Sequence, residues 1–336
     1  MTTVTPDQAY GKACACYVAG DLEKAEKICH SILGAAPDYV DAAYLLAIIA
    51  NRRGRHDEGD RLLQRAIEHR GFSIRLDGSA PTSPRHGTTP HAGLQALLLR
   101  DAGRYIELLR SFTRWLPQLQ EITPAAAASD APHWNNPWIP PLDGIALYAI
   151  TAQKRPRRYI EVGSGNSTKF VRRAIADHGL ATTIVSIDPQ PRAAIDSLCD
   201  VVIRKPLEET DLAAFSDLGA GDLVFIDSSH RCLMNSDVTV FFTEILPSLA
   251  PGVTVGIHDI FLPYDYPAEW VARYYSEQYL LACYLLSRSP RFNTILPCHF
   301  LSQHPAAQDA LLALRGGLPD AAPMEGGSFW LELNSV

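Results

Sequence analysis

The sequence predicts a doubly wound α/β domain with a mostly parallel sheet, preceded by an all-α region of helical repeats. Short β-branched runs alternate with helical segments from residue 158 onward, which is typical of a parallel sheet covered on both faces. The first 70 residues match themselves at an offset of 34 positions. Apolar residues make up 47% of the 336-residue chain, as in folded globular proteins, and this length accommodates two units.

The net charge and the cysteine content indicate which binding partners and which cellular compartment to expect. A formal net charge of -7 gives no general attraction for phosphate backbones or anionic lipid, so neither nucleic acid nor a membrane is expected as a partner. No apolar run approaches the roughly 20 residues of a membrane span, and the N-terminus has no signal-peptide pattern. Seven cysteines without a Cys-x-x-Cys pair argue against a disulfide framework and structural zinc. We therefore expect a cytoplasmic protein.

Residues 1–72 are predicted to form helical repeats. Ala13 pairs with Ala47 and Gly20 with Gly54 in the self-match, and small residues let two helices pack closely. The period and these positions resemble tetratricopeptide repeats. That resemblance implies a surface for a protein partner, and because such repeats usually need three copies for stability, the region should pack on a neighbour. An ordinary helical pair is the alternative.

Residues 73–132 are predicted to connect the two regions. The stretch 72–92 is rich in Ser, Thr, Pro and Gly and is expected to be a linker. A helical segment follows at 93–119, and a second stretch rich in proline and alanine runs over 124–132. The second domain is therefore expected to span 133–336.

The second domain should contain five strands that alternate with helices, followed by an antiparallel pair at the sheet edge. The expected strands are 158–162, 182–188, 200–204, 221–227 and 252–259. One expected helix starts near Ser167, and the others cover 191–199, 236–249 and 268–287. The late antiparallel pair comprises 292–300 and 327–333. Ligands of doubly wound sheets bind beyond the carboxyl ends of the strands. The chemistry should therefore lie just after each of the five runs.

The turn after the first strand is the predicted cofactor loop. Its candidate residues are Glu161, Gly163, Ser164, Gly165, Asn166, Ser167 and Thr168. Glycines permit a sharp turn and let a ligand approach the backbone. Ser167 or Thr168 can cap the following helix, whose amide end favours a carboxylate. Thr168 stands where the dinucleotide fingerprint needs its third glycine, which disfavours a nicotinamide cofactor.

Asp188 ends the second strand, 23 positions after Gly165. An acid at this place accepts hydrogen bonds from the hydroxyls of a ribose. Taken alone it would be a surface aspartate or a cap. Together with the loop it predicts a nucleoside-binding pair.

These residues resemble the cofactor site of class I S-adenosylmethionine-dependent methyltransferases, over about residues 134–300. The resemblance implies a seven-stranded sheet whose last strand is antiparallel, and S-adenosylmethionine as the cofactor. It also implies that Glu161 and the glycine loop hold the methionine end, that Asp188 holds the ribose, that Leu207 and Glu208 flank the adenine, and that Asp227 lies near the methionyl part. The implied activity is methyl transfer to a hydroxyl or amine of a small molecule, saccharide or biosynthetic intermediate.

Two carboxylates and two imidazoles follow the fourth and fifth strands: Asp227, His230, His258 and Asp259. Such a cluster can be a base, a metal site or a hydrogen-bonded scaffold. His230 follows an Asp-Ser-Ser turn, so we expect it to open to a pocket and act as the general base on an acceptor hydroxyl. His258 either joins it or lies within its strand and bonds the backbone.

A divalent ion is the alternative way to activate a hydroxyl. Mg²⁺ held by Asp227 and Asp259 would lower the pKa of a bound hydroxyl. Some relatives of the resembled family place metal-binding acids at these two strand ends. Ile260 stands here in place of their third ligand, which speaks against a metal.

Two aromatic segments, 133–144 and 261–270, are expected to complete the rim of the site. An aromatic face suits a sulfonium, and Trp134, Tyr264 and Tyr266 are the candidates, with Tyr264 also a candidate catalytic residue. Ordinary packing is the alternative.

Two other functions remain open: a metal-dependent oxygenase or hydrolase on the same fold, and a catalytically silent cofactor-binding protein whose repeats recruit a partner. Asp-Ser-Ser-His follows the fourth strand in place of Asn-Pro-Pro-Tyr, which disfavours methylation of adenine, glutamine or cytosine.

Overall fold

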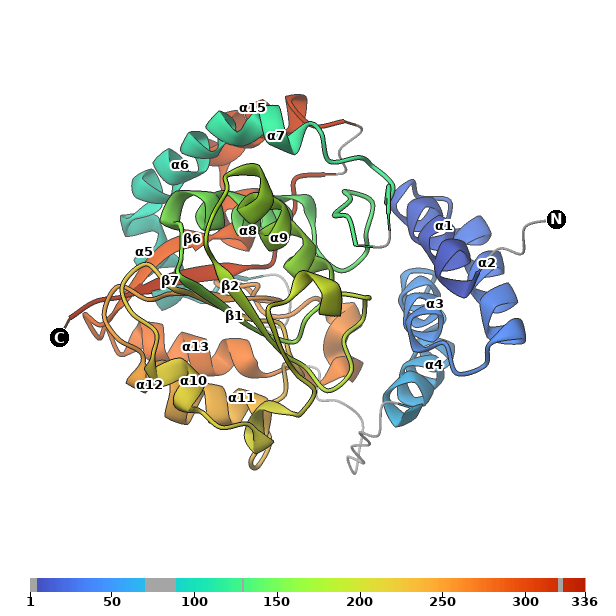
Figure 1. The fold of residues 1–336 in the computed structure, drawn as a ribbon. Helices are drawn as coiled ribbons and strands as arrows, with labels where there is room; N and C mark the ends of the chain where they lie inside the picture. Colours follow the sequence, from blue (N-terminus) through green and yellow to red (C-terminus); the bar gives the residue numbers. More distant parts are fainter. Residues whose placement is uncertain (1–4, 70–88, 129, 320–322, 336) are drawn as a thin grey trace.

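The computed structural model describes residues 5–69, 89–128, 130–319 and 323–335. Figure 1 shows a small helical unit beside a larger unit built around a sheet. The helical unit is the N-terminal repeat region, with helices α1 (Pro6–Val18), α2 (Leu22–Ala35), α3 (Val40–Arg52) and α4 (His56–His69). No helix among the described residues is long and apolar enough to cross a bilayer.

The residues paired by the 34-residue match have equivalent places in the two helical pairs. Gly20 and Gly54 have φ values of 80° and 74° and end the turns after α1 and α3, so they mark turns and not close helix packing. Ala13 and Ala47 are buried within the same two helices. The region has a small apolar core of its own, formed by Ala13, Cys14, Ala25, Cys29, Ile32, Ala42, Leu45, Leu46 and Ile49.

The segment predicted to connect the two regions contributes to the larger core. Most of the expected linker, residues 70–88, lies outside the described residues. The expected helix is divided into α5 (Ala92–Arg100), α6 (Ala102–Ser111), a 3-10 turn and α7 (Leu116–Leu119). The buried side chains of these helices belong to the same core as the sheet. Residues 92–119 therefore pack as part of the second unit.

The sheet has seven strands in the order β3-β2-β1-β4-β5-β7-β6. The strands are β1 (Arg158–Val162), β2 (Thr183–Ile187), β3 (Val201–Ile203), β4 (Leu223–Ile226), β5 (Thr254–Ile257), β6 (Phe292–Pro297) and β7 (Phe329–Leu333). Strands β1 to β5 pair in parallel, and β7 runs antiparallel to both β5 and β6. The predicted mostly parallel seven-stranded sheet is confirmed. The chain order reverses between β1 and β4, which is where ligands bind in such sheets.

The helices around the sheet agree with the predicted alternation, with two exceptions. They are α8 (Pro141–Lys154), α9 (Asn166–Asp177), α10 (Ala213–Ser216), α11 (Asp237–Val240), α12 (Leu246–Ser248), α13 (Glu277–Leu286), α14 (Cys298–Gln303) and α15 (Gln308–Gly316). The expected helix at 191–199 is only a 3-10 turn at Asp196–Leu198. The expected helix at 268–287 is broken at Tyr274, which has a left-handed φ of 55°, so α13 starts only at Glu277.

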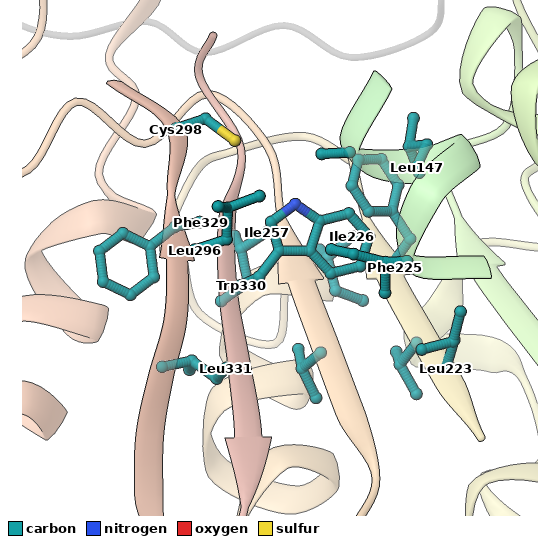
Figure 2. Close-up of a cluster of buried hydrophobic side chains, with 14 of the residues drawn as sticks. Leu147, Leu223, Phe225, Ile226, Ile257, Leu296, Cys298, Phe329, Trp330 and Leu331 are labelled. Atoms are coloured by element: carbon teal, nitrogen blue, oxygen red, sulfur yellow. The ribbon is translucent and has the colours of Figure 1, made fainter. Parts of the chain in front are cut away.

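A tightly packed aromatic pair joins the parallel part of the sheet to its antiparallel edge. The rings of Phe225 on β4 and Trp330 on β7 lie 5.5 Å apart. A Cβ at Gly256 of β5 would lie 2.7 Å from Phe225 and 2.8 Å from Trp330, so only glycine fits between them. Figure 2 shows this cluster, with Leu296 and Phe329 beside Trp330. Burial here fixes the strand ends that carry the site.

Candidate active site

The turn after β1 is held against the end of β4 at a position that only glycine can occupy. Gly163 has a φ of 79°, and a Cβ built on it would lie 1.8 Å from the carbonyl oxygen of Asp227. The Gly163 amide donates to Ile187 O (3.0 Å), and the Asp227 amide donates to Val162 O (2.8 Å). This close approach brings the predicted cofactor loop and Asp227 together at the point where the strand order reverses.

Glu161 supports the loop from inside the protein. Its carboxylate is fully buried and accepts hydrogen bonds from the hydroxyls of Tyr159 (2.9 Å) and Thr168. The Thr168 oxygen in turn accepts the Gly165 amide (3.1 Å). Gly165 is the N-cap of α9, so neither Ser167 nor Thr168 has the capping position expected for it. Contact between Glu161 and the methionine end of a cofactor stays a prediction.

The burial of Glu161 predicts a pH-dependent stability. Burial raises the pKa of its carboxyl to about 7, although hydrogen bonds from Thr168 and Tyr159 lower it. Because the folded-state pKa exceeds the ordinary value of 4.5, the stability linked to this proton is complete below pH 4.5 and is lost as the pH rises through 7. The unfolding free energy of the original protein should therefore fall between pH 5 and pH 8, and in Glu161→Gln this fall should be smaller by about 2–3 kcal/mol.

Urea unfolding at pH 5 and at pH 8, monitored by circular dichroism, measures this difference. Glu209→Gln, at an exposed site, is the control and should keep the slope of the original protein. Equal slopes for Glu161→Gln and the original protein would show that Glu161 does not hold this proton.

Asp188 is bonded directly to the glycine loop. One carboxylate oxygen accepts the Ser164 amide (2.8 Å) and the other accepts the Gln190 amide (2.7 Å). Burial raises the pKa of Asp188, while these amides lower it. The two halves of the predicted nucleoside-binding pair are thus joined. Leu207 and Glu208 follow β3 in a 3-10 turn, where Leu207 is buried in the core and Glu208 is exposed.

The two carboxylates and two imidazoles predicted at the ends of β4 and β5 form one cluster, here called the acid–imidazole centre. His230 Nε2 lies 3.3 Å from Asp227 Oδ1 and 3.5 Å from Asp259 Oδ2. His258 Nδ1 lies 3.3 Å from Asp227 Oδ1 and 3.5 Å from Asp259 Oδ1. His230 and Asp259 have left-handed φ values of 62° and 56°, which are uncommon for residues other than glycine.

Each imidazole has a second carboxylate behind it that the sequence analysis missed. His230 Nδ1 contacts Glu277 of α13, and His258 Nε2 lies 3.2 Å from Asp143 of α8. Asp143 also accepts the amides of Gly327 (2.6 Å) and Ser328 (2.8 Å), which fixes the start of β7. The only sequence signals were an aspartate in the first turn of the mostly apolar α8 and a glutamate before an apolar run.

The carboxylates, not the imidazoles, lie nearest to solvent. The side chains of His230 and His258 are 1% and 3% exposed, against 12% for Asp227 and 17% for Asp259. The expectation that His230 opens to a pocket is therefore wrong, because Glu277 holds the ring in the interior. His258 directly follows β5, and its amide donates to Ile226 O (2.9 Å), so its backbone continues the strand pairing. Its ring contacts Asp143 and does not bond the backbone.

The charges in the centre are strongly coupled. Burial alone would lower the pKa of His230, but Glu277 and Asp227 raise it to about 10. The pKa of His258 is likewise raised by Asp227 and Asp259 against the effect of burial. Burial would raise the pKa of Asp227, yet His258 and His230 hold it well below its usual range. At neutral pH both imidazoles therefore carry a second proton when no other cation is present.

The atoms facing the middle of the centre could also bind a metal ion. Asp227, His230 and Asp259 each offer one ligand atom, and these atoms lie within 4.8 Å of one another. His230 Nε2 is buried without a well-oriented hydrogen-bond partner. A lone pair there would face two carboxylates, so the arrangement requires either a proton or a metal ion between them. Glu277 behind His230 is the kind of outer carboxylate that orients metal-bound histidines.

The aromatic residues expected at the rim are mostly structural. Trp134 is buried against Phe170, with ring centroids 5.4 Å apart. Tyr266 is also buried, and its hydroxyl accepts the Gln278 amide (3.2 Å). Tyr264 packs against His299, with ring centroids 5.9 Å apart, and its backbone bonds Phe261 and Gln278, so among the described residues it contacts no side chain of the acid–imidazole centre.

Family models match both parts of the chain. Residues 160–260 match the model of a methyltransferase domain, and residues 19–76 match that of a tetratricopeptide repeat. A comparison with curated proteins finds no match.

Several solved structures resemble the chain at low sequence identity. The O-methyltransferase from Bacillus cereus in complex with SAH is 14% identical, with a TM-score of 0.36 over 74% of this chain and 92% of that one. The SAH-bound Podospora anserina methyltransferase PaMTH1 is 14% identical, with a TM-score of 0.36 over 74% and 99%. The plantazolicin methyltransferase BpumL in complex with SAH is 16% identical, with a TM-score of 0.32 over 73% and 100%.

Proposed function

We propose that this chain, which carries a methyltransferase domain preceded by a tetratricopeptide-like repeat region, transfers a methyl group from S-adenosylmethionine to a small molecule. The acceptor atom is a hydroxyl oxygen or an amine nitrogen. One observation carries the proposal: the glycine loop bonded to Asp188 and the acid–imidazole centre meet where the order of β1 and β4 reverses. That juxtaposition supports the proposal, because a nucleoside bound at the loop would lie beside the carboxylates Asp227 and Asp259.

The loop fits the methionine part of the cofactor. The helix α9 has no side-chain cap at its N-terminus, so its first amides can receive a carboxylate. A Cβ at Gly165 would meet only the Cβ of Arg192, at 3.8 Å, so the loop is open on that side. The Ser228 hydroxyl, next to Asp227, is buried without a partner. When bound, S-adenosylmethionine supplies a methyl group on a sulfonium, which a lone pair of the acceptor displaces.

The residues of the chain align the reactants. Asp188 has lone pairs left for ribose hydroxyls beyond the two amides it binds, and Leu207 and Glu208 flank the adenine. Asp227 and Asp259 face the acceptor, since they are more exposed than the imidazoles. In this role His230 and His258 hold the carboxylates in place, and His230 is not the first proton acceptor. Alignment of the displacement supplies much of the rate.

A divalent ion such as Mg²⁺ would be held by Asp227 and Asp259 together with His230. Bound there, it would lower the pKa of an acceptor hydroxyl. If a metal is used, Asp259→Ala should lower activity, and added Mg²⁺ or Mn²⁺ should partly restore it; a chelator should inhibit the original protein. Activity that is unchanged by chelator and not restored by either ion would exclude a metal role.

The acceptor is best found by product identification. Incubation of the protein with methyl-labelled cofactor and a cell extract should label a small hydroxylated or amine-bearing molecule. A chelator-sensitive activity that needs no S-adenosylmethionine would favour an oxygenase or hydrolase. Cofactor binding without any labelled product would favour a silent binding protein whose repeats recruit a partner. The seven free cysteines suit the reducing cytoplasm proposed for it.

A further inference from the structure

Tyr44, on α3 of the repeat region, reaches into the unit that holds the sheet. Its hydroxyl lies 3.4 Å from that of Tyr275, and its ring packs 4.9 Å from Trp138. The indole of Trp138 donates a hydrogen bond to Tyr10 of α1 (3.1 Å), which adds a second contact between the units. The Tyr275 ring lies 4.5 Å from the His230 ring. A single aromatic side chain thus separates the repeat region from the acid–imidazole centre.

Two arginines of the sheet-bearing unit meet at Tyr44. The Arg192 guanidinium, from the loop after β2, lies 6.0 Å from the centre of the Tyr44 ring and 4.5 Å from that of Trp138. The Arg273 guanidinium lies 5.2 Å from Tyr44 and stacks on Trp270 at 3.6 Å. Burial raises the pKa of Tyr44, but Arg273 and Arg192 lower it further than burial raises it.

Neither guanidinium is neutralised by a direct ion pair. Within the part of the chain that the structure describes, no carboxylate oxygen lies within 4.0 Å of Arg192 or Arg273. Arg204 and Arg173, by contrast, pair closely with Asp196 and Asp177. Arg273 is only 8% exposed, so its charge is largely removed from water. Burial lowers the pKa of both guanidiniums, but Asp227 raises that of Arg192, and Tyr44, Tyr275 and Asp259 raise that of Arg273, so both stay charged. A charged guanidinium without a close carboxylate keeps donors for an oxyanion.

We propose that Arg192, Arg273 and Tyr44 bind an anionic group of the methyl acceptor, a carboxylate or a phosphate or sulfate ester. The inference rests on the proposed methyl transfer. Guanidinium groups match such oxyanions through paired hydrogen bonds, and the Tyr44 hydroxyl adds a donor. The repeat region then forms one wall of the acceptor site. It is part of the catalytic unit and not only a surface for a protein partner.

The proposed site borders a cavity between the two units at Arg192. This cavity, of about 840 Å³, is lined by Arg192 and Trp138 on one side and by Tyr10 and Tyr39 of the repeat region on the other, while Arg273 and Tyr44 lie outside its lining. Ligand sites typically occupy about 300–1,000 Å³. The two guanidiniums would also offset the repulsion between an anionic acceptor and the carboxylates Asp227 and Asp259, to which they are close enough to couple.

Calorimetric titration of inorganic sulfate into the full-length protein tests this site, with and without S-adenosylhomocysteine. We expect sulfate to bind in the presence of S-adenosylhomocysteine. Arg192→Met and Arg273→Met should each weaken sulfate binding by about tenfold or more and leave the affinity for S-adenosylhomocysteine within a few-fold. Tyr44→Phe should weaken sulfate binding less. Arg104→Met, at an exposed site on α6, is the control and should change neither affinity.

Three outcomes would overturn the proposal. The first is no sulfate binding, and the second is binding that survives both arginine substitutions, which would indicate an adventitious ion only. The third is that S-adenosylhomocysteine displaces sulfate and that the arginine variants lose affinity for S-adenosylhomocysteine. This result would indicate that the arginines bind the carboxylate of the cofactor. If Arg273→Met does not fold, Arg273→Lys keeps the charge and should bind sulfate with intermediate affinity. Arginine-dependent sulfate binding without any nucleoside binding would support the anion site and contradict methyl transfer.

Discussion

Replacement of His230 by glutamine should lower turnover by on the order of 10²–10⁴-fold, the scale of a lost proton-transfer arrangement. The ring of His230 is fixed on one side by Glu277 and on the other lies 3.3 Å from Asp227 and 3.5 Å from Asp259. Without it the two carboxylates repel each other and lose the geometry in which they meet the acceptor. Affinity for S-adenosylmethionine should stay within a few-fold, because the loop and Asp188 are untouched.

Single-turnover kinetics and calorimetry on the same preparation separate these two effects. Glu277→Gln, which removes only the outer charge, should give a smaller loss of turnover. His178→Gln is the control, since His178 contacts Tyr148 and Trp115 away from the centre. Full activity in His230→Gln would contradict the role of His230 in holding Asp227 and Asp259 in place.

Gly163→Ala should abolish measurable cofactor binding. The added Cβ would lie 1.8 Å from the Asp227 carbonyl oxygen, so the backbone of the loop must move away from β4. The positive φ adds strain of about 1–3 kcal/mol. Because Asp188 bonds the next residue, Ser164, the same movement disrupts the nucleoside site. Cofactor affinity should fall more than about 100-fold, equivalent to the loss of two charge-assisted hydrogen bonds.

Gly179→Ala is a matched control for this substitution. Gly179 also has a positive φ, of 55°, but a Cβ there would meet no atom within 4 Å. It should lose a similar amount of unfolding free energy from strain and keep its cofactor affinity. Calorimetric titration and thermal unfolding of both variants give the comparison. Unchanged affinity in Gly163→Ala would show that the loop does not form the cofactor site.

The sequence was sufficient to predict the sheet because the strands are continuous apolar runs, and their ends could be located from the residues that follow. It also predicted that Asp227, His230, His258 and Asp259 come together, since parallel strands end at one edge of the sheet. It could not predict the depth of each side chain. His230 looks like an exposed residue after a polar turn, yet Glu277, 47 positions later, holds it in the interior.

The contacts between the two units could not be predicted from the sequence either. Nothing in the apolar pattern of α3 distinguishes Tyr44 from a residue of the repeat core. Arg192 lies in a segment that was expected to be helical, and a helix there would have pointed its side chain in a different direction from the one observed. The packing that places Tyr44, Arg192 and Arg273 together depends on how two separate folding units meet, and local periodicity holds no information on that.

Calorimetric titration of S-adenosylmethionine and NAD into the full-length protein and into Asp188→Ala tests the central claim most directly. Asp188 joins the second strand to the glycine loop through the Ser164 amide, so it should contribute about 1–3 kcal/mol to cofactor binding. We expect S-adenosylmethionine or S-adenosylhomocysteine to bind, NAD to bind little, and Asp188→Ala to weaken binding by that amount. Tighter binding of NAD, or no binding of either S-adenosyl compound, would contradict the account.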